Sequence, residues 1–424
     1  MSIVPADTAA VAPGADRPDR DQPLSVTLVE FNPSGGLFQF AVQLGEALAR
    51  RGHLVELLTG PDPELGSRVA GFTIRPLLPT WHARDGGSAQ LWRRRGRRVT
   101  RAGRYHLAWG VLVPHLARHK PDVVQFSESR FPVDGLVPAV LARRRGSPVL
   151  VALAHAPVPF NEQRPEAGVF KGGRLLHLAL SLGYRSLDAL LVLGEQTAHD
   201  LLAAFPAVRR VDVVPHGDEG VFLQGAVSSA SDTDPVVLFF GTMQAYKGLG
   251  VLLEAFATVR AQRPSARLVL AGAASGDVAL AALRQQAERV GGVEFRVGYV
   301  PVADVQELFA VARVVVAPYL YANASGVVEL ARTFGRPVVA SAVGDLPAVV
   351  RHGVTGLVVP PADPARLAAA LLRLLDDPQE AQRMGQAAKA ASATRSSWDL
   401  VATEIEVVYE ACLRARSRPG GGSA

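Results

Sequence analysis

The feature that most constrains the fold of this chain is a regular alternation of short β-branched runs with helix-length amphipathic segments. In the first unit, residues 25–31 predict a strand, apolar residues from Leu37 to Leu48 recur at helical spacing, and residues 55–58 predict the next strand. Gly52 ends the intervening helix. Strands that alternate with helices in this way are typical of a parallel sheet wound by helices.

The alternation is interrupted once, by a stretch rich in Ser, Asp and Gly at residues 224–235, and then restarts. Such a stretch predicts an exposed linker between two domains. We therefore expect two Rossmann-like, doubly wound parallel-sheet domains that face each other across a cleft, where ligands of such sheets bind. Further strands are predicted at residues 73–77, 122–126, 149–154, 190–193 and 210–214 before the linker, and at 236–240, 267–271, 294–297, 313–317, 337–340 and 357–359 after it.

The predicted boundaries follow from these patterns. Residues 1–22 read as a disordered leader, because they are rich in Asp, Pro and Ala and contain no apolar run. The N-terminal domain is expected over residues 23–217 and the C-terminal domain over 218–395. A final helix at 396–416 is expected to pack back towards the N-terminal domain, and residues 417–424 form a disordered tail.

Composition excludes several classes of protein. The single cysteine, Cys412, rules out a disulfide framework and a four-thiolate metal site, which fits a reducing compartment. No stretch approaches the roughly 18 uninterrupted apolar residues that would span a bilayer. We expect a cytoplasmic protein. The net charge of +6 is concentrated in one block, from Arg93 to Arg104.

Two glycine-containing loops are suited to bind an anion. Gly35 and Gly36 lie between the first strand and the first helix, where a helix N-terminus favours negative charge. A glycine turn of this kind also occurs for purely structural reasons, and both interpretations remain open. The loop lacks a GxGxxG pattern, and no acidic residue ends the second strand, which counts against NAD binding. In the second domain Gly241 ends a strand, and Lys247 opens the next helix with a point charge suited to a diphosphate.

A third loop follows the strand predicted at residues 313–317. Ser325 could cap the helix that begins here, and Gly326 would open its first backbone amides to a ligand. Capping explains the serine, but it does not explain the glycine and Val327 that follow.

Taken in order, these motifs resemble those of glycosyltransferase family 4, whose members are retaining enzymes of the GT-B fold. The resemblance covers about residues 25–409 and is most specific in the second half. Its motifs are Gly35-Gly36, Ala154-His155-Ala156-Pro157, Pro215-His216-Gly217-Asp218, the Gly-x5-Lys-Gly loop from Gly241 to Gly248, Ser325-Gly326-Val327, Gly335-Arg336-Pro337-Val338-Val339-Ala340, Gly344-Asp345-Leu346-Pro347 and Gly353-Val354-Thr355-Gly356.

The resemblance implies a role for each motif. The first domain would hold the acceptor and the second a nucleotide diphosphate sugar. His155 would contact the transferring sugar, and with Lys247 it would form the catalytic pair. His216 is expected to be structural. The donor would be bound by Gly36, Gly241, Thr242, Lys247, Tyr299, Val300, Ser325, Gly326, Val327 and Glu329, with the base at the loop of Tyr299 and Val300.

Three positions depart from the family pattern. Thr242 stands where many members carry an arginine, and Ala322 and Leu330 stand where they carry paired glutamates. Glu329 lies one position before the second of these, a rotation of about 100° on a helix. It either reaches the nucleotide ribose or is a solvated helix residue, and these interpretations are equally supported.

The sequence contains no convincing cluster of metal ligands, so we expect no cofactor and a metal-independent reaction. Two helix N-termini and one lysine would then stabilise the charge that develops on the leaving diphosphate. The resemblance implies retention of anomeric configuration, with the leaving phosphate accepting the acceptor's proton.

The block from Arg93 to Arg104 has three interpretations, one of which is a site for a phosphorylated soluble acceptor. In family members that act on lipid-linked acceptors, a basic amphipathic element of the N-terminal domain docks on anionic membrane, which implies peripheral contact with the inner face. The alternative is a solvated arginine-rich helix. Nucleic acid is not an expected partner, because aromatic residues make up only 6% of the chain and no recognition motif is present.

The leading hypothesis is a retaining glycosyltransferase that acts on an unidentified acceptor, whether glycan, lipid-linked or natural product. Two alternatives remain. One is a non-catalytic GT-B protein that binds nucleotide sugar or acceptor, and the other is a GT-B enzyme that makes a non-glycosidic coupling.

Overall fold

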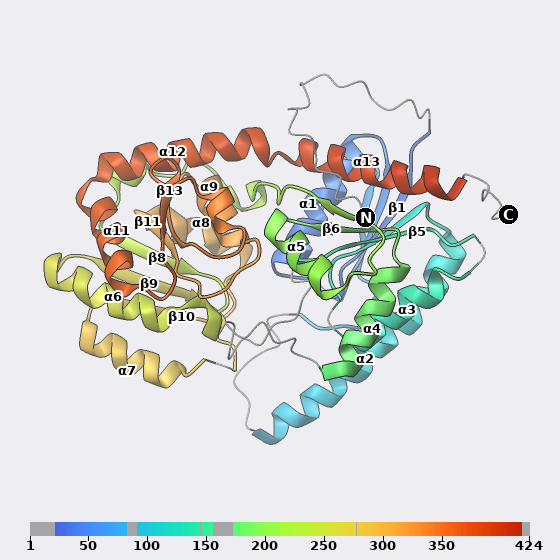
Figure 1. The fold of residues 1–424 in the computed structure, drawn as a ribbon, viewed down its shortest axis with the longest axis horizontal. Coiled ribbons are helices and arrows are strands. Elements are labelled where there is room, and N and C mark those ends of the chain that lie inside the picture. The colour runs from blue at the N-terminus through green and yellow to red at the C-terminus, as the bar shows by residue number, and fades with distance from the viewer. Residues whose placement is uncertain are drawn as a thin grey trace.

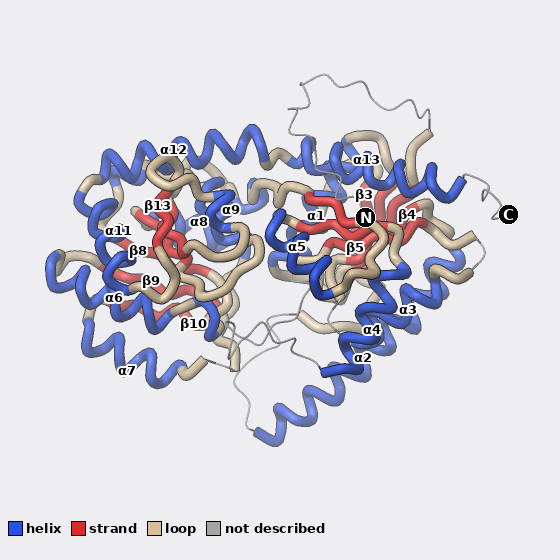
Figure 2. Tube along the Cα trace, viewed as in Figure 1, coloured by secondary structure: helices blue, strands red, loops and turns tan. Residues whose placement is uncertain are grey.

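The computed structural model describes residues 22–82, 91–129, 131–144, 146–155, 173–276 and 278–417. Two α/β domains lie side by side, each built on one parallel sheet with helices on both faces (Figure 1). Figure 2 shows the strands gathered at the centre of each domain. Residues 1–21 and 418–424, which hold nearly all of the predicted leader and tail, lie outside the described residues.

The sheet of the N-terminal domain has the order β3-β2-β1-β4-β5-β6-β7, with every neighbouring pair parallel. Each strand predicted in this half is present, with ends that differ by one or two residues. The strands are β1 (Ser25–Val29), β2 (Leu54–Leu58), β3 (Phe72–Arg75), β4 (Val123–Phe126), β5 (Val149–Leu153), β6 (Ala189–Val192) and β7 (Val211–Val213).

The sheet of the C-terminal domain has the order β10-β9-β8-β11-β12-β13 and is also parallel throughout. All strands predicted after the linker are found here. They are β8 (Val236–Phe240), β9 (Arg267–Gly272), β10 (Val293–Val297), β11 (Val314–Ala317), β12 (Val338–Ser341) and β13 (Gly356–Val359).

The helices complete two doubly wound domains, as the alternation of apolar runs predicts. They are α1 (Gly36–Arg50), α2 (Leu91–His119), α3 (Pro132–Leu141), α4 (Gly173–Ser186), α5 (Glu195–Ala204), α6 (Leu249–Gln262), α7 (Leu280–Val290), α8 (Val302–Val311), α9 (Gly326–Thr333), α10 (Leu346–Val349), α11 (Pro364–Asp376), α12 (Pro378–Arg395) and α13 (Trp398–Ser417).

The N-terminal sheet is apolar on both faces. Its strands are nearly continuous apolar runs, and alternate residues of each strand point to opposite sides. Val26 and Leu28 pack with residues of α1 and α13 in one cluster, whereas Val29 packs with residues of α2, α4 and α5 in another. The helices α1 and α13 therefore cover one face of this sheet, and α2 to α5 cover the other.

The chain crosses between the domains twice. It first passes over between β7 and Glu219, whose amide already donates to Thr333, and α12 and α13 carry it back along the upper edge in Figure 1. The segment 224–235, predicted as the linker, instead packs on the C-terminal domain, where the buried Ala230 donates to Gln382 of α12. Tyr409 of α13 donates a hydrogen bond to the Gln125 side chain of β4 (2.5 Å), and Glu406 pairs with Arg51 and His53 at the end of α1. The last helix thus belongs to the core of the first domain.

No helix of the described residues combines the length and the apolar character that crossing a bilayer requires.

Gly248 offers a test of the fold of the C-terminal domain. Its φ is +68°, and an added Cβ would lie 1.9 Å from the carbonyl oxygen of Pro318. We expect Gly248→Ala to destabilise this domain by about 2 kcal/mol or more, since the conformation and the overlap each cost about 1 kcal/mol or more. Urea unfolding followed by circular dichroism measures the loss.

Gly250 provides a matched control two residues away. It lies in the first turn of α6, and an added Cβ would meet nothing within 4 Å. We expect Gly250→Ala to leave the unfolding midpoint unchanged or to raise it, because alanine favours the helix. Equal midpoints for the two variants would contradict the described turn.

Candidate functional site

A cavity of about 610 Å³ lies between the two domains and is lined by residues of both. It lies at the carboxyl ends of β1 and β4 in one sheet and of β8 and β11 in the other. At these two places the strand order of each sheet reverses, which is where parallel α/β sheets bind their ligands. The cavity is of the size typical of a small-molecule site.

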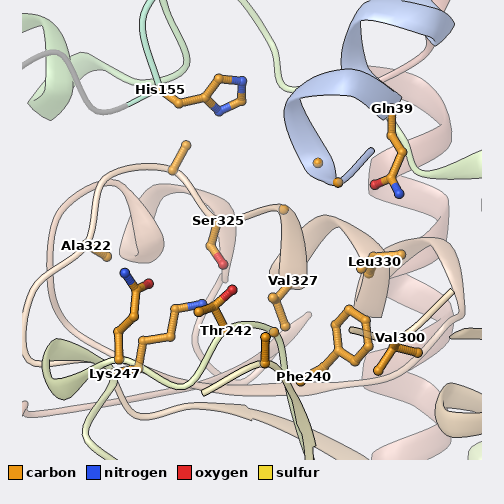
Figure 3. Close-up of a pocket in the computed structure, with 18 of the residues that line it drawn as sticks. Gln39, His155, Phe240, Thr242, Lys247, Val300, Ala322, Ser325, Val327 and Leu330 are labelled. Carbon is orange, nitrogen blue, oxygen red and sulfur yellow. The ribbon is translucent and has the colours of Figure 1, made fainter. Parts of the chain in front are cut away.

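The cavity brings together nearly all of the predicted site residues (Figure 3). Only Glu329 is not part of its lining. The predicted residues in the wall are Gly36, His155, Gly241, Thr242, Lys247, Tyr299, Val300, Ser325, Gly326 and Val327.

Two glycines help to position Lys247 at the cavity. Gly241, which follows β8, has a φ of +105°, and an added Cβ would lie 3.2 Å from the Lys247 Nζ. The same ammonium group lies 5.1 Å from the ring centroid of Tyr319. Lys247 ends a short 3₁₀ turn, and Gly248 in the left-handed conformation leads into α6 at Leu249. The lysine therefore precedes the helix rather than opening it, and a bulkier residue at Gly241 would displace its charge.

Ser325 occupies the N-cap position of α9 in an extended conformation, but its side chain makes no capping hydrogen bond. In Figure 3 it lies at the centre of the cavity wall, near Thr242 and Val327. The first amides of a helix have no partner within the helix, so those of Gly326 and Val327 are suited to bind an anion. Capping is thus not what this serine does here.

The N-terminal domain supplies the opposite wall. Gly35 has a φ of +87° at the N-cap of α1, and Gly36 begins the helix. His155 follows β5 and faces the loops of the other domain in Figure 3. The Asn323 side chain donates a hydrogen bond across the cleft to the His155 carbonyl oxygen (3.2 Å). The ring of His155 contacts those of Phe40 and His216 edge to face.

Glu329 is buried, and both of its oxygens accept hydrogen bonds from Arg332, at 2.7 and 2.8 Å. Burial raises the pKa of Glu329, although Arg332 opposes the shift. The wall instead contains Ala322 and Leu330, the positions at which the family pattern has glutamates. One residue of offset on a helix turns the carboxylate away, so the structure does not bring Glu329 together with the other predicted residues.

The structure adds Glu219, which the sequence analysis did not single out. Its carboxyl group lines the cavity, and Oε1 lies 3.6 Å from the position that a Cβ on Gly326 would take. Burial, together with the nearby charge of Glu329, raises the pKa of Glu219 to about 8. The neutral form therefore prevails at neutral pH, and it does not repel an anion at the start of α9.

His216 lies beside Glu219, with 4.0 Å between Nδ1 and Oε1. Burial lowers the pKa of His216 to about 4, so the ring is neutral at physiological pH. The only sequence signal for the neighbouring side chains of His216 and Glu219 is the acidic pair Asp218-Glu219, which directly follows Pro215-His216-Gly217.

A second, smaller cavity of about 90 Å³ adjoins the first and shares Glu128 and Ser129 with it. Its lining is rich in aromatic rings, including those of Trp81, Tyr105 and Trp109. It lies entirely within the N-terminal domain. Among the described residues, no group of three His, Cys, Asp or Glu side chains is placed to hold a metal ion.

The raised pKa of Glu219 predicts how stability changes with pH. The folded protein holds this proton up to about pH 8, whereas the unfolded chain releases it near the ordinary glutamate pKa of 4.5. Stability must therefore fall as pH rises between these two values, since the folded state binds more protons there. We expect the melting temperature of the wild type to fall more between pH 5 and 8 than that of Glu219→Gln. Parallel pH profiles for the two proteins would contradict the assignment.

Comparison with known proteins agrees with this geometry. A family model described as Glycosyltransferase Family 4 matches residues 34–217, and one described as Glycosyl transferases group 1 matches residues 234–377. A D-inositol 3-phosphate glycosyltransferase of Mycobacterium avium is 30% identical over 411 residues, which are 90% of this chain and 90% of that protein. The protein of the same name from Segniliparus rotundus is 34% identical over 217 residues, 49% of this chain and 48% of its own length.

Solved structures share the fold. Sucrose-phosphate synthase from Thermosynechococcus elongatus superposes with a TM-score of 0.71 at 23% identity, over 93% of this chain and 100% of that chain. Anabaena HepE in complex with UDP and glucose superposes with a TM-score of 0.63 at 18% identity, over 91% and 99%. The chain belongs to glycosyltransferase family 4, and it is a glycosyltransferase of the GT-B fold.

Proposed function

We propose that this enzyme transfers a hexosyl unit from a nucleotide diphosphate sugar, held mainly by the C-terminal domain, to an acceptor held by the N-terminal domain. The reaction would retain the anomeric configuration and need no metal. The observation that carries the proposal is the convergence of Lys247 with the N-termini of α1 and α9 on one cavity. The HepE structures hold UDP or UDP-glucose, which supports a nucleotide sugar as the donor.

These groups match what the chemistry requires. Cleavage of the sugar–phosphate bond places negative charge on the leaving diphosphate, and a fixed positive environment lowers the barrier. A helix N-terminus contributes about 0.3–2 kcal/mol and a charge-assisted hydrogen bond about 1.5–3 kcal/mol. Two helices and Lys247 thus provide a stabilisation that can replace a cation.

His155 lies on the opposite wall, where it would contact the transferring sugar. As the family resemblance implies, the acceptor would attack from the face that the diphosphate leaves, and the leaving phosphate would take its proton. The small aromatic cavity beside Glu128 supports the N-terminal domain as the acceptor side, because it opens next to the donor cavity.

The test combines one variant with one control. We expect Lys247→Ala to weaken donor binding by about 10- to 100-fold, because the variant loses the free energy of one charge-assisted hydrogen bond. Lys389→Ala, an exposed lysine of α12, serves as the control and should bind as the wild type does. Calorimetry with UDP, GDP, ADP and TDP first selects the nucleotide. Unchanged affinity in Lys247→Ala would refute the diphosphate assignment.

The same preparation tests the chemistry. Donor hydrolysis and transfer should continue after treatment with EDTA, and NMR of the product should show the anomeric configuration of the donor. Loss of turnover that added Mg²⁺ or Mn²⁺ restores, or an inverted product, would contradict the proposed mechanism.

A second candidate function is favoured by one observation. Ala322 and Leu330 line the cavity where the family pattern has carboxylates, as expected of a protein that binds a nucleotide sugar without turning it over. Nucleotide binding with no hydrolysis or transfer over a broad acceptor panel would support this alternative over the enzyme.

We also propose that the helix α2 contacts anionic membrane peripherally, at the cytoplasmic face. The side chains of residues 91–98 lie outside the described residues, but their backbone forms the first turns of α2, which project at the bottom of Figure 1. Apolar side chains are exposed nearby, since Val99 and Leu107 of α2 are 74% and 57% accessible. Basic and apolar residues together are what an interfacial helix presents to lipid.

Liposome flotation tests this contact. Arg101 lies over the Trp81 ring and Arg104 bonds to the Pro79 carbonyl, so both are left intact. We expect replacing Arg93, Arg94, Arg97 and Arg98 by Gln to abolish flotation with phosphatidylglycerol vesicles, since each arginine contributes about 1 kcal/mol. The control replaces the exposed arginines Arg289, Arg351, Arg366 and Arg395 of the other domain by Gln. Equal flotation of the two variants would contradict the membrane contact and support a solvated arginine-rich helix.

A further inference from the structure

The carboxylate of Glu64 lies where the two domains meet, beside the donor cavity but outside its lining. The residue follows β2, and its backbone N–H donates a hydrogen bond to the carbonyl oxygen of Pro33 (2.9 Å). This bond ties the loop after β2 to the loop after β1. The side chain is half-buried, so its interactions are only partly screened by water.

Within its own domain Glu64 binds the start of α1. Its Oε2 accepts hydrogen bonds from the Gly35 amide (3.4 Å) and from the Gln39 side chain (3.2 Å). Gly35 belongs to the turn that the proposed function assigns to the diphosphate, and Gln39 lines the same cavity.

Across the cleft the same carboxylate binds the start of α8. The hydroxyl group of Tyr299 donates to Oε2, and the Val302 amide donates to Oε1 (3.4 Å). Tyr299 lines the cavity in the loop expected to receive the nucleobase, and its ring also contacts His82 of the N-terminal domain edge to face. One anion therefore lies between two helix N-termini that belong to different domains, an arrangement that both helix dipoles stabilise.

We propose that Glu64 is a positioning residue for the donor, a clamp that holds the nucleobase loop at a fixed distance from the glycine turn. A nucleotide diphosphate must span this distance, with its base at Tyr299 and its phosphates at Gly36. The clamp thus pre-organises the closed cleft before the donor arrives, and binding costs less as a result. The inference rests on the proposed function for the identity of the ligand, but not for the clamp itself.

The conformational part is measured without any ligand. Spin labels at the exposed positions Arg50 of α1 and Glu307 of α8 report the distance between the domains. We expect Glu64→Gln and Tyr299→Phe to broaden this distance distribution towards longer values. The control Glu294→Gln removes an exposed partner of Arg296 and should leave the distribution unchanged. A distribution that is unaltered in both clamp variants would overturn the proposal.

The binding part uses the nucleoside diphosphate selected by calorimetry. Glu64→Gln should raise its dissociation constant and the donor KM about tenfold while kcat for donor hydrolysis stays the same, because the lost bond acts on binding alone. The double variant Glu64→Gln/Tyr299→Phe should bind the nucleotide with the same affinity as the single variant that binds it less tightly. Both substitutions disrupt the same hydrogen bond, so their effects should not add. Additive losses, or a fall in kcat with KM unchanged, would refute the role.

These readouts separate the two proposals. A wild-type protein that binds none of the four nucleotides contradicts the proposed function, whereas the distance measurement still decides whether Glu64 joins the domains. A distance that changes without any change in donor KM would show a clamp that does not position the donor, and the inference would be wrong.

Discussion

The reversal of strand order beside β1 and beside β8 is the constraint on which the rest of this structure depends. At each reversal the connections leave in opposite directions, so no helix covers the strand ends, and a gap remains there. Because the two domains place these gaps face to face, the N-termini of α1 and α9 line one cavity. Under the proposed function, the affinity for a diphosphate would thus arise from the topology of both sheets, and Lys247 would add a full charge to it.

The ionisable side chains buried near this cavity are either uncharged or paired with an opposite charge. Glu219 is neutral near pH 7 because it is buried, and Glu329 is neutralised by Arg332. His216 is uncharged for the same reason as Glu219. Neither Glu219 nor Glu329 therefore adds an uncompensated negative charge beside the start of α9.

Much of this could be predicted from the sequence, because the information was local. Buried parallel strands are continuous apolar runs, and every predicted strand is present, with only its ends shifted. The glycines around Lys247 and Ser325 marked the loops correctly, since each permits a backbone conformation or an approach that other residues do not. Glu329 shows the limit, because a rotation of one helical position moved its carboxylate out of the cavity. Glu64 had no local signal at all, since its partners Gln39 and Tyr299 are brought to it only by the fold.

The path of the last helix has a consequence for how the protein is made. One face of the N-terminal sheet is completed by α13, whose residues Val401, Ile405 and Tyr409 are fully buried against it. These residues follow the whole C-terminal domain in the sequence, so they are synthesised after it. The C-terminal domain can therefore close its core on the ribosome before α13 is made, while the domain translated earlier keeps an apolar surface uncovered until α13 has been synthesised.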